Sequence, residues 1–492
     1  MPPLVALFLW FVLLLALLYF DPAKVRGTSA ALWIPVIWMF IAGSRLPSQW
    51  LGALTGQSWV ANLQDGNPLD RTIDLVLIGL AIAILTSRSF QWSSFFTRNF
   101  ALILLIIYAL LSIVWSDFPL VAFKRWFRDL GNYVIVLVVL SDPRPLDAVR
   151  TVFRRLGYLL IPLSILLDKY FPTVSKIYDF WTGVGVYAGV ATGKNLLGLL
   201  ALLSGVFFFW DAVARWPDRN ERCVKPTILV NVAFLAMCIS LLITADSATC
   251  KVCMAIGCLV VVAVQSQWGR RHPGLLKLLI PGTFLAYLAL TFGFGMTGDL
   301  AAAVGKDPTL TDRTKIWTFV LGMHTNPWIG TGYESFWMGP RLQWFTDMSG
   351  LGHLNEAHNG YLEVYLNLGI MGLLLIAGVL VGSYRTICKR LAPFSSFASL
   401  SMALWTVMLF FSVTEAGFRS GMMWLAFLLV AISAGVRERV PSTALVGNVG
   451  PAGQSRGQVS LEGHIQGAEN SSGPQMHPRV ASGYRASGGN RG

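Results

Sequence analysis

The sequence is poor in charge. Only 13% of its 492 residues are charged, whereas soluble domains carry about 25%. Hydrophobic residues make up 54% of the chain, and 18 Trp and 30 Phe add a heavy aromatic load. This composition excludes a disordered protein, a collagen, a coiled coil and a set of soluble domains. Apolar runs of roughly 20 residues, the length that crosses a bilayer as a helix, recur along the chain. They predict an all-α polytopic membrane protein.

Cysteine is also scarce. Six cysteines in a chain of this length make no disulfide framework. Cys250 and Cys253 are spaced as C-x-x-C, but they open an apolar run and no second pair accompanies them. We interpret them as small residues that pack between helices, with a redox or metal role as the alternative.

The excess of basic residues has its own explanation. Lys and Arg outnumber Asp and Glu by 38 to 25, which gives a net charge of +13. In a soluble protein this charge would suggest a nucleic-acid partner. Here the basic residues lie in short loops between apolar runs, where the positive-inside rule explains them as signals of membrane orientation. Nucleic-acid binding is therefore not expected, because no basic face has a soluble fold to carry it.

The apolar runs predict about 12–13 membrane helices. We expect N-terminal membrane helices over 1–100, a membrane core over 101–295, a large loop over 296–360 and C-terminal membrane helices over 361–440. The first run has no charged segment before it and no cleavage site, so it is expected to remain as an anchor with its N-terminus outside. The candidate spans are about 4–20, 29–46, 72–88, 99–116, 130–141, 156–168, 186–210, 227–245, 251–267, 274–295, 361–382, 397–414 and 419–436.

The charges of the loops predict the orientation. Basic loops alternate at every second position, which assigns them to the cytoplasm. The loop 296–360 then lies on the extracytoplasmic side. Residues 441–492 are too polar to bury a core, so we expect a disordered and dispensable cytoplasmic tail. The basic loops contain Arg144, Arg150, Arg154 and Arg155, then Arg215, Arg219, Arg222 and Lys225, then Arg270 and Arg271, and finally Arg385, Lys389 and Arg390.

One predicted exterior loop breaks the positive-inside pattern, because it carries Lys124, Arg125 and Arg128. Arg125 and Arg128 are three residues apart, so on a helix they would share a face. A guanidinium group presents paired donors that suit phosphate oxygens. We expect the two arginines to bind a diphosphate, with snorkelling to the membrane interface or an Arg128–Asp117 ion pair as the alternative.

A glycine-rich segment ends at Lys194. Gly189 to Gly193 is one residue too short for a phosphate-binding P-loop, and Asn195 replaces the Ser or Thr that would hold magnesium. Lys194 nevertheless begins an apolar helix from the exterior side, and a lysine at a helix N-terminus can bind an anion. Close helix packing through the glycines is the alternative.

His358 is the candidate base of the large loop. It is predicted to lie where an exterior helix begins, and there the helix dipole disfavours the imidazolium. The ring is therefore expected to be neutral and able to accept a proton. The alternative is a structural histidine that caps the helix or bonds Glu356. Glu334, Glu356 and Glu415 are the competing acid–base candidates.

The large loop contains three motifs in order. An Arg-x-x-x-Trp pair precedes an Asn-Pro-x-x-Gly-x-Gly-x-x-x-Phe segment, and a His-Asn-x-x-Leu sequence follows with a glycine further on. These motifs consist of Arg313 and Trp317, of Asn326 to Phe336, and of His358, Asn359, Leu362 and Gly369. At these residues the chain resembles the O-antigen ligase and polymerase superfamily of bacterial envelope glycosyltransferases. The run LTDRTKIW followed by GTGYESFW is most similar to the exopolysaccharide polymerases of that superfamily.

The resemblance implies a metal-independent glycosyltransferase without a cofactor. Its substrate would be an undecaprenyl-diphosphate-linked oligosaccharide, whose repeat units it polymerises or ligates at the extracytoplasmic face of the bacterial inner membrane in exopolysaccharide or O-antigen biosynthesis. Without magnesium, Arg and Lys must stabilise the leaving diphosphate, and the exterior loops contain no Asp-x-Asp metal motif. The implied catalytic residues are His358 and Arg313; the implied diphosphate ligands are Arg125, Arg128, Lys194 and Arg313; the implied accessory residues are Glu334, Glu356, Asn359 and Glu415.

The sequence departs from the superfamily pattern at one place. Members carry a Ser-Arg or Ser-Lys pair at an exterior helix start, and the corresponding Asp246-Ser247-Ala248-Thr249 lacks the basic residue. We expect Lys251 or Lys194 to supply that anion contact. The implied partners are a glycan or lipid acceptor, membrane lipids, and polysaccharide export and chain-length proteins.

A transporter or flippase for lipid-linked sugars is the alternative from another class. It would explain the many spans, but not a loop of about 65 residues rich in Trp and polar groups. A flippase would also need ionisable residues near the bilayer centre, and the predicted spans contain few. Polymerase and ligase differ only in the acceptor, which the sequence does not determine.

Overall fold

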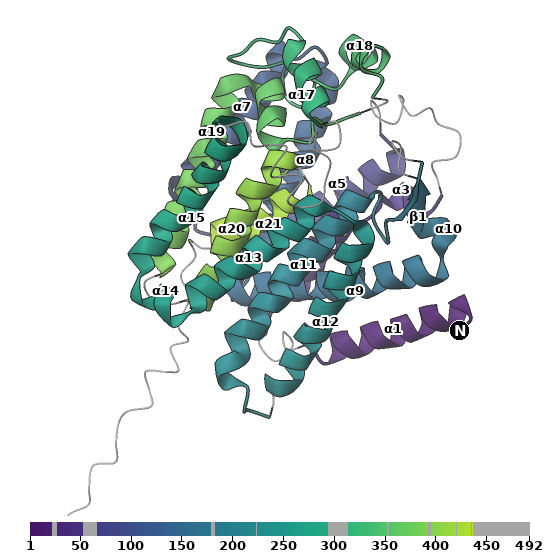
Figure 1. Cartoon of the computed structure of the whole chain (residues 1–492), viewed down its shortest axis with the longest axis vertical. Helices are drawn as coiled ribbons and strands as arrows, with labels where there is room; N and C mark the ends of the chain where they lie inside the picture. The colour runs from purple at the N-terminus through teal and green to yellow at the C-terminus, as the bar shows by residue number, and fades with distance from the viewer. Residues whose placement is uncertain are drawn as a thin grey trace, which may run out of the picture. The chain divides into compact units, whose positions relative to one another are not determined.

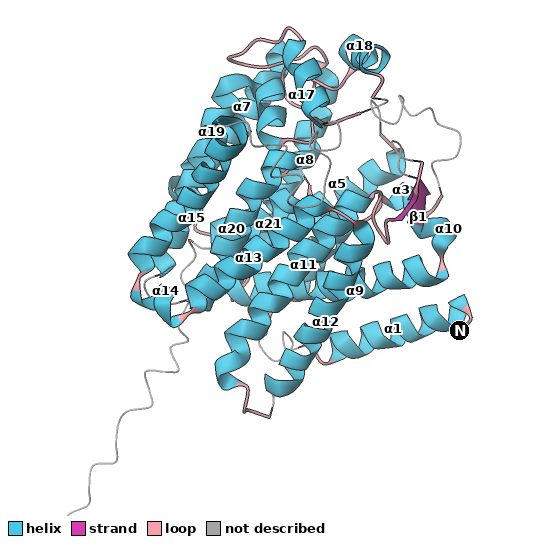
Figure 2. Cartoon of the chain, in the orientation of Figure 1, coloured by secondary structure: helices cyan, strands magenta, loops and turns pink. Residues whose placement is uncertain are grey.

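The computed structural model describes residues 1–21, 27–52, 66–178, 183–222, 224–293, 313–351, 354–391, 395–419, 421–433 and 435. These residues belong to one unit of the chain, Met1–Arg439, and the chain has a second unit, Val440–Gly492. The predicted tail 441–492 and the first part of the predicted large loop, up to residue 312, lie outside the described residues. The described part is built almost entirely of helices (Figure 1, Figure 2).

The N-terminal half ends in a small hairpin. Strands β1 (Lys176–Tyr178) and β2 (Gly185–Tyr187) pair antiparallel, with Lys176 opposite Tyr187. The helices that precede them are α1 (Pro3–Tyr19), α2 (Trp33–Gly43), α3 (Pro47–Trp50), α5 (Pro68–Ser87), α6 (Trp92–Arg98), α7 (Phe100–Leu111), α8 (Pro119–Leu140), α9 (Pro145–Tyr170) and α10 (Pro172–Ser175), with short 3-10 turns at Ala30–Leu32 and Ser112–Trp115.

The C-terminal half contains the long inner helices and two short helices, α17 and α18, that lie together at one end of the bundle (Figure 1). Its helices are α11 (Lys194–Arg215), α12 (Val224–Ala245), α13 (Ala248–Gln265), α14 (Gln267–Arg271), α15 (Pro273–Leu288), α17 (Arg313–Gly322), α18 (Gly339–Ser349), α19 (Gly360–Leu391), α20 (Ser396–Thr414) and α21 (Met422–Ser433), with a 3-10 turn at Trp216–Asp218 and a π turn at Ala289–Gly293.

The lengths and compositions of the helices confirm an all-α polytopic membrane protein. Among the described residues, six helices are long and apolar enough to cross a membrane, and α5 with α6 makes one further bent pair with an angle of 116°. Shorter apolar helices lie at Pro3–Tyr19, Ala30–Gly43, Phe100–Trp115 and Met422–Ser433. Helices α8 and α9 are also long enough, at 22 and 26 residues, but they carry several charged side chains. The count of 12–13 spans remains a prediction.

Helices α8 and α9 begin earlier than the sequence predicts. The spans predicted at 130–141 and 156–168 are the second parts of these two helices. The predicted exterior loop around Arg125 is therefore the first half of α8, and Arg150, Arg154 and Arg155 lie in α9 and not in a loop. The loop predictions were wrong because hydropathy alone cannot follow a helix through a charged segment.

The charges in α9 are neutralised inside the bundle, at the end opposite to α17. Arg154 lies 2.9 Å from Asp211 of α11 and 3.8 Å from Asp21, and Arg155 lies 3.1 Å from Asp21. Asn231 of α12 also donates to Asp211, at 2.9 Å. Charged side chains inside a membrane bundle are tolerated when they pair with one another. This network explains how α9 continues as a helix through basic residues.

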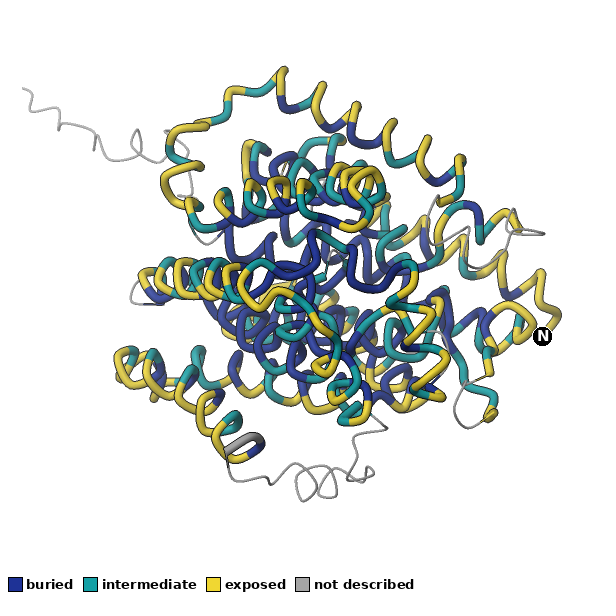
Figure 3. The backbone as a smooth tube through the Cα atoms, turned by 90° about the horizontal axis from the view of Figure 1, so that it is seen from above, coloured by how far each residue is buried: buried dark blue, intermediate teal, exposed yellow. Residues whose placement is uncertain are grey.

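The core of the unit lies around α20. In α20, 89% of the membrane-spanning window is buried, against 22% in Pro273–Thr291, so α20 is central and α15 is peripheral. Viewed from above, buried segments fill the centre and exposed ones surround them (Figure 3). A second, smaller core lies between α17, α18 and the start of α19, and contains Ile316, Val320, Phe336, Trp337, Phe345, Leu351, Ala357 and Leu366.

Helix α19 is interrupted at Gly369. This residue has φ +66° and ψ −164°, a conformation open to glycine and strained for other residues. The segment 326–332 packs against the interruption, and the amides of Ile370 and Met371 donate to the carbonyls of Pro327 (2.9 Å) and Trp328 (3.2 Å). The loop thus supplies the acceptors that the broken helix lacks.

Candidate functional site

Helix α17 presents Arg313 and Trp317 on one face, because residues four apart are one helical turn apart. Arg313 Nη2 lies 2.6 Å from Glu415 Oε1, and its Nη1 donates to the carbonyl of Thr414, the last residue of α20. Trp317 Nε1 donates to the carbonyl of Ala357 at 2.9 Å. The Arg-x-x-x-Trp motif therefore ties α17 both to the end of α20 and to the segment before α19.

His358 lies two residues before α19, close to the predicted helix start. Its Nδ1 lies 3.0 Å from Glu356 Oε1 and 3.5 Å from Glu415 Oε2. The side chains of His358, Glu356 and Glu415 are 23%, 28% and 6% exposed. We call Arg313, Glu356, His358 and Glu415 the His358 cluster. The cap of α19 is Asn359, whose Oδ1 accepts from the amide of Leu362 at 3.0 Å.

The charges of the His358 cluster contradict the prediction of a neutral imidazole. Burial would lower the pKa of His358, but Glu356 and Glu415 outweigh it and raise this pKa to about 10. Burial would raise the pKa of Glu356, but the bond to His358 and the charges of His358, Arg419 and Arg313 lower it to about 2. The ring is therefore an imidazolium at neutral pH. The prediction was wrong because two adjacent carboxylates outweigh the dipole of one helix.

Backbone strain is concentrated at the same place. Among the described residues, only Asp246, Glu334 and His358 combine a side chain with a positive φ. Glu334 has φ +50° and His358 has φ +49°. Such conformations persist only when the surrounding structure holds them, and they cluster at functional sites. Two of the three thus lie in segments that carry the predicted motifs.

The segment 326–337 is held by the first turns of α19. Asn367 Oδ1 accepts from the amides of Ser335 (3.0 Å) and Phe336 (3.2 Å), and the carbonyl of Asn367 accepts from the amide of Gly332 at 2.9 Å. A Cβ on Gly330 would collide with the backbone of Asn367. The glycines of the second motif are therefore required where the loop backbone lies directly on the helix.

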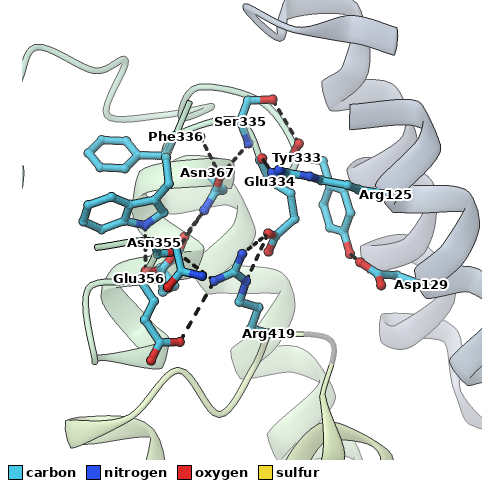
Figure 4. Close-up of polar contacts among 12 residues, drawn as sticks. Arg125, Asp129, Tyr333, Glu334, Ser335, Phe336, Asn355, Glu356, Asn367 and Arg419 are labelled. Carbon is cyan, nitrogen blue, oxygen red and sulfur yellow. Dashed lines mark hydrogen bonds and ion pairs between the residues drawn. The ribbon is translucent and has the colours of Figure 1, made fainter. Parts of the chain in front are cut away.

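Arg419 is a central residue that the sequence analysis missed. Its guanidinium donates to Glu334 Oε2 from Nε (3.1 Å) and lies 2.9 Å from it at Nη2, and its Nη1 donates to the carbonyl of Asn355 (2.8 Å) and lies 4.0 Å from Glu356 Oε2 (Figure 4). Burial acts to raise the pKa of the Glu334 carboxyl, but the charges of Arg419, Arg125 and Arg128 lower it below its ordinary value. A signal was available, because Arg419 is a basic residue at the predicted exterior end of the span 419–436, and Arg125 and Arg128 lie on the same predicted side.

The basic residues of α8 border this network. Arg125 donates to the carbonyl of Glu334, and Arg128 lies 3.0 Å from Asp129. Asp129 also accepts from the hydroxyl of Tyr333 at 2.9 Å (Figure 4). The Arg128–Asp117 pair considered as an alternative is not formed, since Asp117 lies 2.9 Å from Arg341. The first half of α8 thus faces the second motif of the loop.

A cavity of about 290 Å³ opens among these groups. It connects the charged face of α8 with the segments before α19 and after α20, so it places Arg128 and Arg419 beside the carboxylates of Glu334 and Glu356. The residues that line it are Arg128, Asp129, Glu334, Glu356, Ala416, Arg419 and Gly421.

Lys194 begins α11, as the sequence predicts. The first turn of α11 lies beside α13, where a Cβ on Gly198 would contact Cys250 at 3.1 Å, and Thr249 of α13 shares a 2.8 Å hydrogen bond with Thr414. Lys194 therefore lies at the end of the bundle where Arg313 lies. Cys250 packs between helices there, and Lys251 lies 2.7 Å from Asp246.

The His358 cluster could in principle hold a metal ion. One ligand atom each from Glu356, His358 and Glu415 lies within 4.8 Å of the others, and these ligand types suit a divalent cation. Their charges are already compensated, however, because Glu415 faces Arg313 and Glu356 faces both His358 and Arg419. A metal would have to displace these cations, so the cluster fits an ion-pair network better than a metal centre.

Comparison with known proteins points to the part of the chain that contains the three motifs. The O-antigen ligase family model matches residues 232–377, which include all three motifs. The exopolysaccharide production protein ExoQ of Rhizobium meliloti (strain 1021) is 28% identical over 335 residues, or 65% of this chain and 70% of that protein. These matches confirm the resemblance that the motifs predict: the chain is similar to the O-antigen ligase and exopolysaccharide polymerase superfamily of membrane proteins.

Proposed function

We propose that this protein is a glycosyltransferase that polymerises or ligates oligosaccharide repeat units carried on undecaprenyl diphosphate. The observation that carries the proposal is the site itself: Glu356 of the His358 cluster lines one cavity together with Arg128 and Arg419, and Arg125 donates to the carbonyl of Glu334, which lines the same cavity. Such a site combines proton transfer with the binding of a strongly anionic leaving group. The relative ExoQ, named for exopolysaccharide production, supports the same class of reaction.

The reaction breaks the bond between the anomeric carbon and the diphosphate oxygen, and the diphosphate leaves with the electron pair. An acceptor hydroxyl oxygen forms the new bond to this carbon and loses its proton to a base. Arg313, Arg125, Arg128 and Lys194 bind the diphosphate in this proposal, and guanidinium donors placed where charge develops lower the barrier. Their positive charge takes the place of a metal ion, so the transfer is metal-independent.

His358 handles the acceptor proton. Its Nδ1 faces the two carboxylates, which leaves Nε2 as the ring atom to meet the acceptor hydroxyl. Because the pKa of His358 is about 10, the neutral ring is the minor form at neutral pH and a strong base when it forms. Glu356, the more exposed carboxylate of the pair, is the competing base, with Asn359, Glu334 and Glu415 as accessory residues.

A pH–rate profile separates these two bases. If His358 accepts the proton, kcat/KM rises with pH toward about 10 and this limb disappears in His358→Gln. If Glu356 accepts it, the profile is flat above neutral pH and His358→Gln retains turnover. His358→Ala should abolish transfer while the protein still accumulates and binds the lipid-linked donor. Full transfer by that variant would refute a catalytic role for His358.

The site is proposed to face the extracytoplasmic side of the bacterial inner membrane. The alternation of basic loops supports this orientation. A cysteine placed at the exposed Met348 of α18 should react with an impermeant reagent in intact spheroplasts, and one placed at the exposed Arg219 should react only after lysis. The reverse pattern would overturn the orientation.

The biological product decides between polymerase and ligase. A strain without this protein should accumulate single or very short repeat units if the protein is a polymerase. Long chains that are not attached to their final acceptor would instead identify a ligase. Lipid-linked units retained on the cytoplasmic face, with little glycan made but with normal length and attachment of what is made, would favour the transporter class and refute the proposal.

A further inference from the structure

The backbone of Ala357 is held from two directions. Its N–H donates to Glu363 Oε1 on α19, and its carbonyl accepts from Trp317 Nε1 on α17 at 2.9 Å. Ala357 itself is fully buried in the small core between α17, α18 and α19. Its two chain neighbours are Glu356 and His358, the acid–base pair of the proposed reaction. We call Trp317 and Glu363 the Ala357 clamp.

Glu363 is built into its place as an acceptor. The same Oε1 of Glu363 accepts from Trp337 Nε1 at 2.9 Å. The side-chain Nδ2 of Asn367 donates to the backbone carbonyl of Glu363 at 2.9 Å and lies 3.4 Å from Glu363 Oε2. Asn367 in turn accepts from the amides of Ser335 and Phe336, as the contacts in Figure 4 show. One turn of α19 thus fixes both loop segments of the site, through buried polar groups that are all paired.

The clamp acts on a strained segment. His358 has φ +49°, a conformation that a residue with a side chain keeps only when the surrounding structure imposes it. The N–H and the carbonyl of Ala357 belong to the two peptide units that join it to Glu356 and to His358. Because both units are fixed, the Cα atoms from which the Glu356 and His358 side chains branch are fixed as well. The 3.0 Å approach of His358 Nδ1 to Glu356 Oε1 depends on this backbone, because neither side chain is deeply buried.

Trp317 links the clamp to the other half of the site. It lies one helical turn after Arg313, whose guanidinium holds Glu415 at 2.6 Å. A shift of α17 would therefore move the Ala357 carbonyl and the Arg313–Glu415 pair together. The spacing of the first motif is explained by this double attachment.

We propose that Trp317 and Glu363 are positioning residues for glycosyl transfer, which hold Glu356 and His358 in reacting geometry by fixing the two peptide units on either side of Ala357. This inference rests on the proposed function. Neither side chain needs to touch the substrate. The clamp acts through geometry, and displacements of about 1 Å in a reacting group can reduce rates about 100-fold.

The decisive variant is Trp317→Phe. It keeps an aromatic ring in the small core but removes the N–H that holds the Ala357 carbonyl. We expect kcat for transfer from a purified undecaprenyl-diphosphate-linked oligosaccharide to fall about 10- to 100-fold, with KM for this donor within about twofold of wild type. Trp344→Phe is the matched control, since Trp344 is a partly exposed residue of α18 outside the clamp. It should behave as wild type.

The pH profile distinguishes positioning from simple stabilisation. His358 faces Glu356 and Glu415, with Arg313 and Arg419 behind these carboxylates. If the clamp loosens, His358 moves away from the carboxylates and the alkaline limb of the rate profile shifts to lower pH in Trp317→Phe. A purely structural role would lower the Tm and the yield without moving the limb. That result, or an unchanged kcat, would overturn the inference.

Glu363 provides a second test. Glu363→Gln keeps one oxygen for the two N–H donors, whereas Glu363→Ala keeps none, so Gln should retain clearly more activity than Ala. An equal loss of activity in the two variants, both folded, would contradict the clamp. If Glu363→Ala does not fold, the Trp317→Phe result tests the clamp instead. Absence of transfer by the wild-type protein would refute the proposed function, whereas an active wild type and an inactive His358→Ala with a normal Trp317→Phe would refute only the clamp.

Discussion

The Oε2 atom of Glu415 lies 3.5 Å from His358 Nδ1, while its Oε1 atom lies 2.6 Å from Arg313 Nη2. One buried carboxylate therefore separates an imidazolium from a guanidinium. Glu415 directly follows α20, and the two cations come from the start of α17 and from the segment before α19. Ion pairs thus join three segments that are distant in sequence at the candidate site.

Stability should depend on pH through His358. Its pKa is about 10 in the folded protein and near the ordinary 6.5 of imidazole when the chain unfolds. A raised pKa contributes stability that is complete below about pH 6.5 and is lost as the pH rises through about 10. The Tm difference between detergent-purified wild type and His358→Gln should therefore narrow from about pH 6 to about pH 10. A difference that stays constant over this range would contradict the assignment.

Arg313→Lys should impair transfer although it keeps the charge. Arg313 donates from two nitrogens, to Glu415 and to the carbonyl of Thr414, and an ammonium cannot reproduce this fork. We expect at least about a tenfold loss of kcat/KM, and a loss of about 100-fold or more in Arg313→Ala. Arg341→Lys is the matched control, because Arg341 pairs with the exposed Asp117. Equal activities of the two lysine variants would remove Arg313 from the site.

The Arg419–Glu334 pair allows stability and activity to be separated. Arg419→Met would leave the largely buried Glu334 without its closest cation, at a cost of up to about 3 kcal/mol, so the Tm should fall. Adding Glu334→Gln removes the unpaired charge and should recover most of the Tm. Transfer should remain low in the double variant, because the cavity still lacks Arg419. Recovery of transfer along with the Tm would assign this pair to stability alone.

Gly369→Ala should disable the protein. Gly369 has φ +66°, and a Cβ there would collide with the Trp328 carbonyl, so the loop segment could not dock on α19. We expect a lower Tm and a loss of transfer. Gly382→Ala in the same helix is the control, since its Cβ would meet no atom within 4 Å and alanine favours helix. Comparable losses in both variants would show that the helix tolerates no alanine at either position.

Hydropathy predicts most of the fold, because long apolar helices leave a strong local signal. Six of the described helices meet the length and composition of a membrane span. The same signal failed at α8 and α9, where Arg125 and Arg154 lie within helices. Their charges are neutralised by contacts with other segments, such as Arg154 with Asp211, and local sequence does not reveal such contacts.

The motifs predict which segments form the candidate site, but not their electrostatics. Arg313, Glu356, His358 and Glu415 were all identified from sequence, and the structure places them together. The charge of His358 was predicted incorrectly because it depends on Glu415, which lies in another part of the chain. Arg419 was missed because it lies outside the motifs, although it breaks the positive-inside pattern as Arg125 does.

The interruption of α19 at Gly369 also constrains how the protein is assembled. The amides of Ile370 and Met371 take their acceptors from Pro327 and Trp328, so the upper part of this span is not complete by itself. An unpaired backbone group in hydrocarbon costs several kcal/mol. The loop segment must therefore be docked before α19 can settle fully into lipid, so membrane insertion of α19 is coupled to folding of the loop.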